Sequence, residues 1–344
     1  MINFYAPGRP GETLSSPNQC AALTNEAVWI DLLEPTQEEE TTLEAALGIN
    51  IPTREELQAI ELSSRLYEED GVLHMTGTVL SHADSETPES AAISFILAGN
   101  KLVTLRYADP VPFRTFRNYR EANLQRYTTP GQFLGGIIDA IIERVADILE
   151  GVGARLDDIS LKVFDPHRVQ TRMSLPARLK ESPGGKARKA RQRDFVEILR
   201  RIGRASDLVT RARESLVSFT RLVAFYREVR NQSGTATRES QAHIKTIVGD
   251  LGALSDHAGF LSTKVSFLLD ATLGMINNEQ NSIIKILSVA ALVFLPPTLV
   301  AGIYGMNFEH MPELKWLHGY PFAMTLMIGA AVLPYLWFKR KGWL

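Results

Sequence analysis

The histidines, the lone cysteine and one glycine pair are the residues from which a catalytic or metal site could be built. The chain has 7 histidines and 1 cysteine, Cys20, and no two histidines have the i, i+3 or i, i+4 spacing that places two ligands on one helix face. Gly184-Gly185-Lys186 resembles part of a phosphate-binding loop, but the loop's first glycine is absent and Ala187 replaces the magnesium-binding Ser or Thr. We therefore expect neither an enzyme nor a nucleotide cofactor.

Length, composition and net charge limit the classes of function that are expected. The chain has 344 residues, of which 45% are hydrophobic, and a net charge of -2. This length is enough for two domains. A nearly neutral chain lacks the excess of cations with which a protein neutralises phosphates, so we do not expect nucleic acid as a partner.

Two uncharged segments near the C-terminus indicate membrane helices. Residues 286–303 and 320–338 contain about 18 and 19 residues without a formal charge, which is the length that spans a bilayer. The cations that flank these spans are Lys285, Lys339, Arg340 and Lys341. Because flanking cations stay in the cytoplasm, we expect both termini there, residues 305–319 in an outer loop, and residues 339–344 as a basic tail near anionic lipid headgroups. The inner (plasma) membrane is the expected location.

A heptad pattern precedes the first span. Apolar residues at alternating spacings of four and three run from Ile247 to Met275, about four heptads. No proline interrupts residues 237–295, so one helix of about 60 residues is expected, a stalk over 236–282 that continues into the first membrane helix over 283–304. Its apolar seam must pack against copies of itself or against neighbouring helices.

Residues 129–235 have the pattern of an antiparallel helical hairpin. Gly131–Phe164 and Asp194–Arg230 each place apolar residues on one helix face. A basic cluster lies between them, formed by Lys186, Arg188, Lys189, Arg191 and Arg193. This cluster is either a solvated hairpin tip or a contact for anionic lipid or a regulator.

Residues 1–128 favour an α/β domain. The segments 27–32, 71–80, 91–97 and 101–107 read as strands, and Gly99-Asn100 between the last two is a hairpin signal. Thr36 and Glu39 have the spacing of a capping box for a helix that ends near Leu47. The fold class is therefore an α+β cytoplasmic domain joined to a long stalk helix and two C-terminal transmembrane helices.

The most specific motif is Tyr304-Gly305-Met306-Asn307, directly after the first span. Together with the rest of the segment 301–314, Gly319-Tyr320-Pro321 and the last six residues, it resembles the CorA family of magnesium channels, whose signature is Gly-Met-Asn. The match is detailed over about the last 75 residues and holds in layout over the whole chain.

The resemblance implies a funnel-shaped homopentamer whose first membrane helices line one central pore. Tyr304, Gly305, Met306 and Asn307 would form the selectivity filter, because amide and carbonyl oxygens suit the water shell of Mg²⁺. Glu309 and Glu313 would lie in the outer loop. The pore-lining stripe would consist of Asn281, Ile284, Leu287, Ala291, Leu295, Thr298 and Gly302. Among these, Asn281 would form a polar ring, and Leu287 and Leu295 would form dry constrictions.

The resemblance also implies regulation by the transported ion. Asp270 matches the family's acidic ligand for a regulatory Mg²⁺ between subunits, and its partner carboxylate would be Glu68, Glu69 or Asp70. Five carboxylates near an interface repel one another unless a cation bridges them. Internal Mg²⁺ would therefore hold the pore closed.

Two other functions stay open. ZntB-like zinc transporters belong to the same family, although Phe308, Glu309 and Met311-Pro312-Glu313-Leu314 keep the magnesium-channel form. A non-conducting membrane scaffold that senses ions is the alternative from another class. Mg²⁺ is the expected transported ion, and Co²⁺ or Ni²⁺ would be further substrates of the same pathway.

Overall fold

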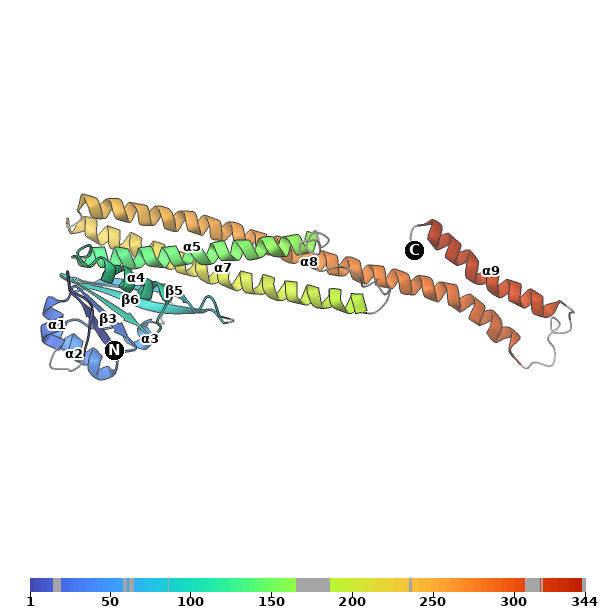
Figure 1. Ribbon diagram of the computed structural model, residues 1–344, viewed down its shortest axis with the longest axis horizontal. Coiled ribbons are helices and arrows are strands. Elements are labelled where there is room, and N and C mark those ends of the chain that lie inside the picture. The colour runs from blue at the N-terminus through green and yellow to red at the C-terminus, as the bar shows by residue number, and fades with distance from the viewer. Residues whose placement is uncertain are drawn as a thin grey trace. The chain divides into compact units, whose positions relative to one another are not determined.

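The computed structural model describes residues 1–14, 20–57, 61, 65–85, 87–164, 186–234, 237–306, 316 and 318–341, without the side chains of 186–193. The chain forms two compact units, Met1–Leu268 and Leu269–Leu344. The first unit contains a β-sheet and long helices, and the second contains the end of one long helix and a further apolar helix (Figure 1).

The first unit is built on one sheet with the strand order β2-β1-β3-β7-β6-β5-β4. Strands β3 and β7 pair in parallel, and the other neighbouring pairs are antiparallel. The predicted hairpin at Gly99-Asn100 is confirmed, with Ala98 opposite Lys101. The strands are β1 (Ile2–Tyr5), β2 (Glu12–Thr13), β3 (Trp29–Leu33), β4 (Leu66–Glu69), β5 (Val72–Ser81), β6 (Glu89–Ala98) and β7 (Lys101–Arg106).

The long helices agree with the segments that were predicted from extended patterns of apolar residues. The predicted capping box begins α2, where the Thr36 side chain accepts a hydrogen bond from the Glu39 N–H and Glu39 Oε2 accepts one from the Thr36 N–H. The second hairpin helix begins at Lys186, earlier than the predicted Asp194. The described helices are α1 (Cys20–Glu26), α2 (Gln37–Leu47), α3 (Arg54–Leu57), α4 (Val111–Ala122), α5 (Pro130–Phe164), α7 (Lys186–Gln232), α8 (Arg238–Tyr304) and α9 (Gly319–Arg340).

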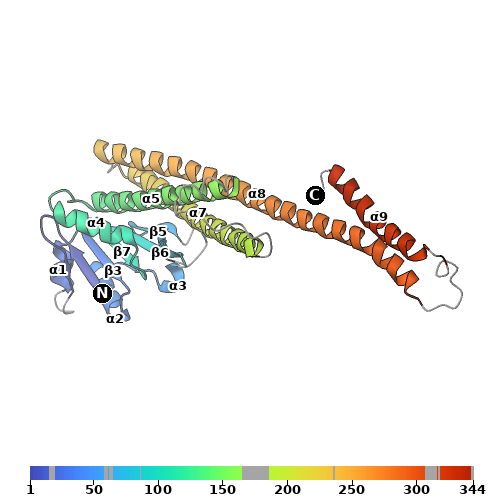
Figure 2. The ribbon, with the colours of Figure 1, turned by 45° about the vertical axis from the view of Figure 1, so that its right-hand side comes forward.

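Helices cover the sheet on both faces, and the strands alternate accordingly. Ile30 and Leu32 of β3 join the apolar core on the side of α1 and α2. Trp29, on the opposite face, contacts the rings of Phe116 of α4 and Phe133 of α5. Figure 2 shows α1 and α2 on one side of the sheet and α4, α5 and α7 on the other.

A buried ion pair lies on the face toward α4 and α5. Arg106 Nε and Nη2 donate to the two carboxylate oxygens of Asp31 at 2.9 and 2.8 Å, and both side chains are 0% exposed. Thr104 Oγ1 donates to Asp31 Oδ1 at 2.8 Å, and Trp29 Nε1 donates to Thr104 Oγ1 at 3.0 Å. This hydrogen-bonded ion pair ties β3 to β7, two strands that run in parallel.

Helices α5, α7 and α8 pack together in the first unit. Gly131 of α5 lies beside Tyr226 of α7, and Asp158 of α5 pairs with Arg201, so α7 runs antiparallel to α5 as predicted. Asp139 pairs with His243 of α8 at 2.9 Å and Asp157 pairs with Lys264 at 2.7 Å. Residue numbers rise together in these two pairs, so α8 runs parallel to α5.

The apolar seam of α8 resolves the alternative that the sequence left open. In the first unit its buried members are Ile247, Leu251, Ala258, Leu261, Val265 and Leu268. Leu261 lies beside Gly153 of α5, where an added Cβ would be 3.7 Å from Leu261 Cδ2. The seam therefore packs against the hairpin of its own chain, which provides the neighbouring helices.

His74 of β5 is a buried histidine from which we expect a loss of stability in acid. It is 3% exposed and stacks on Tyr67 with ring centroids 4.6 Å apart, and burial lowers the pKa of its imidazole below the ordinary value of about 6.5. Because the unfolded chain then binds a proton more readily than the native state, stability is lost as the pH falls below about 6.5. We expect His74→Phe, which keeps a stacked ring, to flatten the decline in urea midpoint between pH 7 and 5. An unchanged pH profile would contradict this assignment.

Candidate ion-conduction site

The C-terminal turn of α8 positions the start of the Gly-Met-Asn motif. The Gly305 N–H donates to the Ala301 carbonyl at 2.9 Å, and the Met306 N–H donates to the Ile303 carbonyl at 3.3 Å. A Cβ atom at position 305 would lie 2.9 Å from the Ala301 oxygen, closer than side chains come to backbone. Glycine is therefore required for the chain to leave the helix in this way.

The predicted pore stripe lies on the C-terminal part of α8. All seven residues, from Asn281 to Gly302, are exposed in the single chain. Leu287 and Leu295 are 70% and 71% exposed, whereas the seam residues of the same helix in the first unit are buried. Apolar side chains with this exposure need a covering partner, which a second copy or lipid supplies.

Two prolines lie inside this part of α8. Pro296 and Pro297 have no N–H, so the carbonyls of Leu292 and Val293 lose their usual helical donors. At the next residue, Thr298 Oγ1 donates to the Phe294 carbonyl at 2.7 Å. The helix nevertheless continues to Tyr304, so the two prolines do not end it.

The predicted regulatory carboxylates are accessible. Asp270 is exposed on α8 in the second unit, and Glu68, Glu69 and Asp70 are exposed in the first. Asp70 and Gly71 have φ values of 48° and 77° and form the two-residue turn between β4 and β5, which gives Asp70 a structural role as well. No group of three or more potential metal ligands occurs within the described residues.

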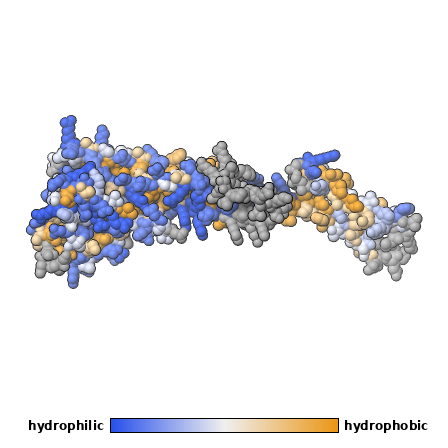
Figure 3. Space-filling model, in the orientation of Figure 1, coloured by the Kyte–Doolittle hydropathy of each residue, from blue (hydrophilic) through white to orange (hydrophobic). Residues whose placement is uncertain are grey.

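Among the residues that the structure describes, two helices have the length and composition to cross a membrane. They are α8 and α9, and only 6% and 11% of their most apolar windows are buried. Figure 3 shows hydrophobic side chains gathered over the second unit. At the end of α9, Lys341 Nζ lies 4.4 Å from the ring centroid of Trp337, an arrangement suited to a membrane interface.

Part of the predicted site is outside the described residues. Asn307, Glu309 and Glu313 belong to this part, as do the side chains of the basic cluster at 186–193. Their roles stay predictions.

Comparison with known proteins decides the family. The model of the CorA-like Mg²⁺ transporter protein family matches residues 24–182 and 187–340. The chain belongs to this CorA-like family. A magnesium transport protein CorA from Mannheimia succiniciproducens is 34% identical over 344 residues and aligns over 100% of both chains. The CorA of Escherichia coli K12 is 34% identical over 319 residues, 92% of each chain. These relatives are transporters, so this CorA-like chain is a membrane transport protein and not an enzyme.

Solved structures support the fold. The CorA magnesium transporter of Methanocaldococcus jannaschii has a TM-score of 0.67 at 18% identity and aligns over 100% of this chain and 99% of its own. The cytoplasmic domain of ZntB from Vibrio parahaemolyticus has a TM-score of 0.54 at 11% identity, over 81% of this chain and 98% of its own. The CorA-like fold with an α/β domain, a long helix and two C-terminal apolar helices is thereby confirmed.

Proposed function

We propose that this CorA-like protein is a channel for Mg²⁺ uptake that works passively down the membrane potential. The observation that carries the proposal is the 34% identity to a magnesium transport protein CorA along the full length of both chains. A divalent cation that moves inward through 100 mV gains about 4.6 kcal/mol, so transport needs no nucleotide. Co²⁺ and Ni²⁺ are proposed to use the same path.

The proposed assembly is a homopentamer in the inner membrane with both termini in the cytoplasm. Its pore is lined by the stripe from Asn281 to Gly302, and the exposure of this stripe in the single chain supports that role. Tyr304, Gly305, Met306 and Asn307 form the filter, and Glu309 and Glu313 attract cations to the outer mouth. Lys339, Arg340 and Lys341 face anionic headgroups, in keeping with the contact between Lys341 and Trp337.

The test is Mg²⁺ uptake into liposomes that contain the purified protein and an internal fluorescent indicator. We expect uptake that follows an imposed inside-negative potential and does not respond to a pH gradient. Absence of Mg²⁺ flux with a folded protein would favour the non-conducting scaffold.

A second candidate is Zn²⁺ transport, which the fold shared with the ZntB cytoplasmic domain favours. The same liposomes, given Zn²⁺ and an imposed proton gradient, distinguish the two. Zn²⁺ flux that depends on the proton gradient, without Mg²⁺ flux, would replace our proposal with this one.

The gate can be tested at Leu295. A narrow apolar neck excludes ions because it does not replace their water, so Leu295→Asn is expected to wet the neck and raise Mg²⁺ flux at high internal Mg²⁺ about tenfold. Ile286→Asn is the matched control, because Ile286 is similarly exposed, at 60%, but lies on the opposite face of α8. Equal leak in both variants, measured in the liposome assay, would argue against Leu295 as a gate.

Regulation can be tested at Asp270. If Mg²⁺ bridges this carboxylate to a neighbouring subunit, Asp270→Asn should raise the internal Mg²⁺ concentration that halves the flux by about tenfold. Asp256→Asn is the control, since Asp256 is an exposed carboxylate on the same helix. Glu68→Gln, Glu69→Gln and Asp70→Asn, measured in the same way, identify the partner. An unshifted dose response for Asp270→Asn rules out its regulatory role.

A further inference from the structure

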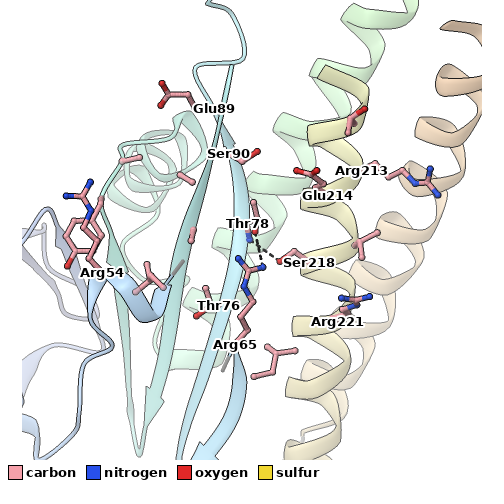
Figure 4. Close-up of a pocket in the computed structure, with 18 residues that line it drawn as sticks. Arg54, Arg65, Thr76, Thr78, Glu89, Ser90, Arg213, Glu214, Ser218 and Arg221 are labelled. Atoms are coloured by element: carbon pink, nitrogen blue, oxygen red, sulfur yellow. Dashed lines mark hydrogen bonds between the residues drawn. The ribbon is translucent and has the colours of Figure 1, made fainter. Parts of the chain in front are cut away.

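A large cavity in the first unit is lined by none of the residues assigned to the proposed pore, filter or regulatory site. It has a volume of about 1030 Å³ and lies between α3, the edge of the sheet at β4 to β6, and α7. Figure 4 shows Arg65 and Thr78 on its strand side and Glu214, Ser218 and Arg221 on its helix side. These residues are up to about 150 positions apart in sequence, and no motif connects them.

The lining is rich in arginine. Four arginines line the cavity, Arg54, Arg65, Arg213 and Arg221, together with two acids, Glu89 and Glu214. Arg213 and Arg221 are exposed, and neither has an ion-pair partner in the part of the chain that the structure describes. Arg65 is half-buried, and burial lowers the pKa of its guanidinium. Arginine forks bind phosphate oxygens in pairs, which lysine does not do.

The two walls are held at a fixed separation. Ser218 Oγ accepts a hydrogen bond from the Thr78 N–H at 3.0 Å, which ties α7 to the open edge of β5. The Thr76 N–H donates to the Arg65 carbonyl at 2.7 Å, and Arg65 Nη1 lies 3.4 Å from Thr78 Oγ1. Ser218 and Arg221 follow Glu214 by four and seven positions, so the three share one face of α7. The cavity thus presents guanidinium and hydroxyl donors on opposite walls.

We propose that this cavity binds the Mg²⁺ complex of an anion with two or more linked phosphoryl groups. Arg65 and Arg221 hold phosphoryl oxygens from opposite walls, and the hydroxyls of Thr78 and Ser218 donate between them. Glu214 lies one turn from Ser218, and its carboxylate accepts hydrogen bonds from the water molecules that coordinate the bound Mg²⁺. The volume admits either a free polyphosphate or a nucleoside triphosphate. This ligand is a regulator and not an energy source.

The test is binding to the full-length protein in lipid nanodiscs, measured by calorimetry at constant free Mg²⁺. The probes are tripolyphosphate, ATP, orthophosphate and citrate. We expect tripolyphosphate to bind, and Arg221→Glu to weaken its binding at least about tenfold, since the substitution removes a charged hydrogen-bond donor and places a negative charge beside the phosphoryl oxygens. Stronger binding of ATP would identify a nucleotide as the ligand, and equal binding would identify a free polyphosphate.

Arg227→Glu is the matched control. Arg227 is also an exposed arginine of α7 but does not line this cavity, so its replacement should change affinity less than about twofold. Three outcomes overturn the proposal, namely no binding of either polyphosphate at millimolar concentration, equal weakening by the two variants, or equal binding of citrate. The assay measures binding and not flux, so its result does not depend on which cation the protein transports.

Discussion

Asn307→Ala is expected to reduce Mg²⁺ uptake at least about 100-fold. In the proposed pentamer, five amide groups form one ring, and each contributes about 1 kcal/mol of hydrogen bonding to the hydrated ion. Their sum, about 5 kcal/mol, exceeds the roughly 2.7 kcal/mol that corresponds to 100-fold. The measurement is initial uptake into indicator-loaded liposomes under a fixed potential.

His318→Ala is the control for Asn307→Ala. His318 lies in the same predicted outer loop, is exposed and forms no side-chain cap on α9. We expect its variant to keep the wild-type rate. Asn307→Gln retains the amide and should lose less flux than Asn307→Ala. Wild-type uptake by Asn307→Ala would remove Asn307 from the filter, while the wild-type flux itself would still test the channel proposal.

Asp31→Ala is expected to destabilise the first unit by about 3 to 5 kcal/mol. The substitution leaves the Arg106 guanidinium buried beside Phe113 with its main partner gone, and an uncompensated buried charge is costly. Asp109 still pairs with Arg106 Nη1 at 2.6 Å, so part of the charge stays compensated. Urea unfolding can be followed by the fluorescence of Trp29, after replacement of Trp316, Trp337 and Trp343 by phenylalanine.

Asp158→Ala provides the comparison for the buried pair. Asp158 bonds to Arg201 and Lys162, which lowers the pKa of its carboxyl, but these side chains are 27% to 48% exposed. A solvent-exposed pair contributes at most about 1 kcal/mol. If the two substitutions lowered the unfolding free energy equally, burial would not be the source of the Asp31 effect.

Long periodic segments could be predicted from sequence, and short edge elements could not. The seam of α8 and the capping box of α2 carry their own signals, and both were confirmed. Strand β2 has only 2 residues and β4 has 4, too few for a period to show. The partner of the α8 seam could not be read either, since the same heptads would pack on a second copy or on the chain's own hairpin.

The functional residues also differ in whether the sequence alone could predict them. Gly305 and its helix-ending turn could be predicted because one short motif contains them. The ion pair of Asp31 and Arg106 and the arginine-lined cavity could not, because their residues come from separate strands and helices that meet only in the fold. Asp70 was one of three candidates for the partner carboxylate of Asp270, and its positive φ in the tight turn between β4 and β5 gives a separate, structural reason for an Asp at this position.

The bond from Thr78 to Ser218 has a consequence for solubility. Among the described residues, β4 pairs with residues 72–75 of β5 and the Thr76 N–H donates to the Arg65 carbonyl, so within these residues β5 beyond Thr76 is a sheet edge. An unpaired edge invites strand addition from another molecule, which leads to aggregation. Because a side chain of α7 occupies the Thr78 N–H, a foreign strand cannot complete its ladder there. A protein whose copies crowd together at a membrane would thereby be protected against mispairing.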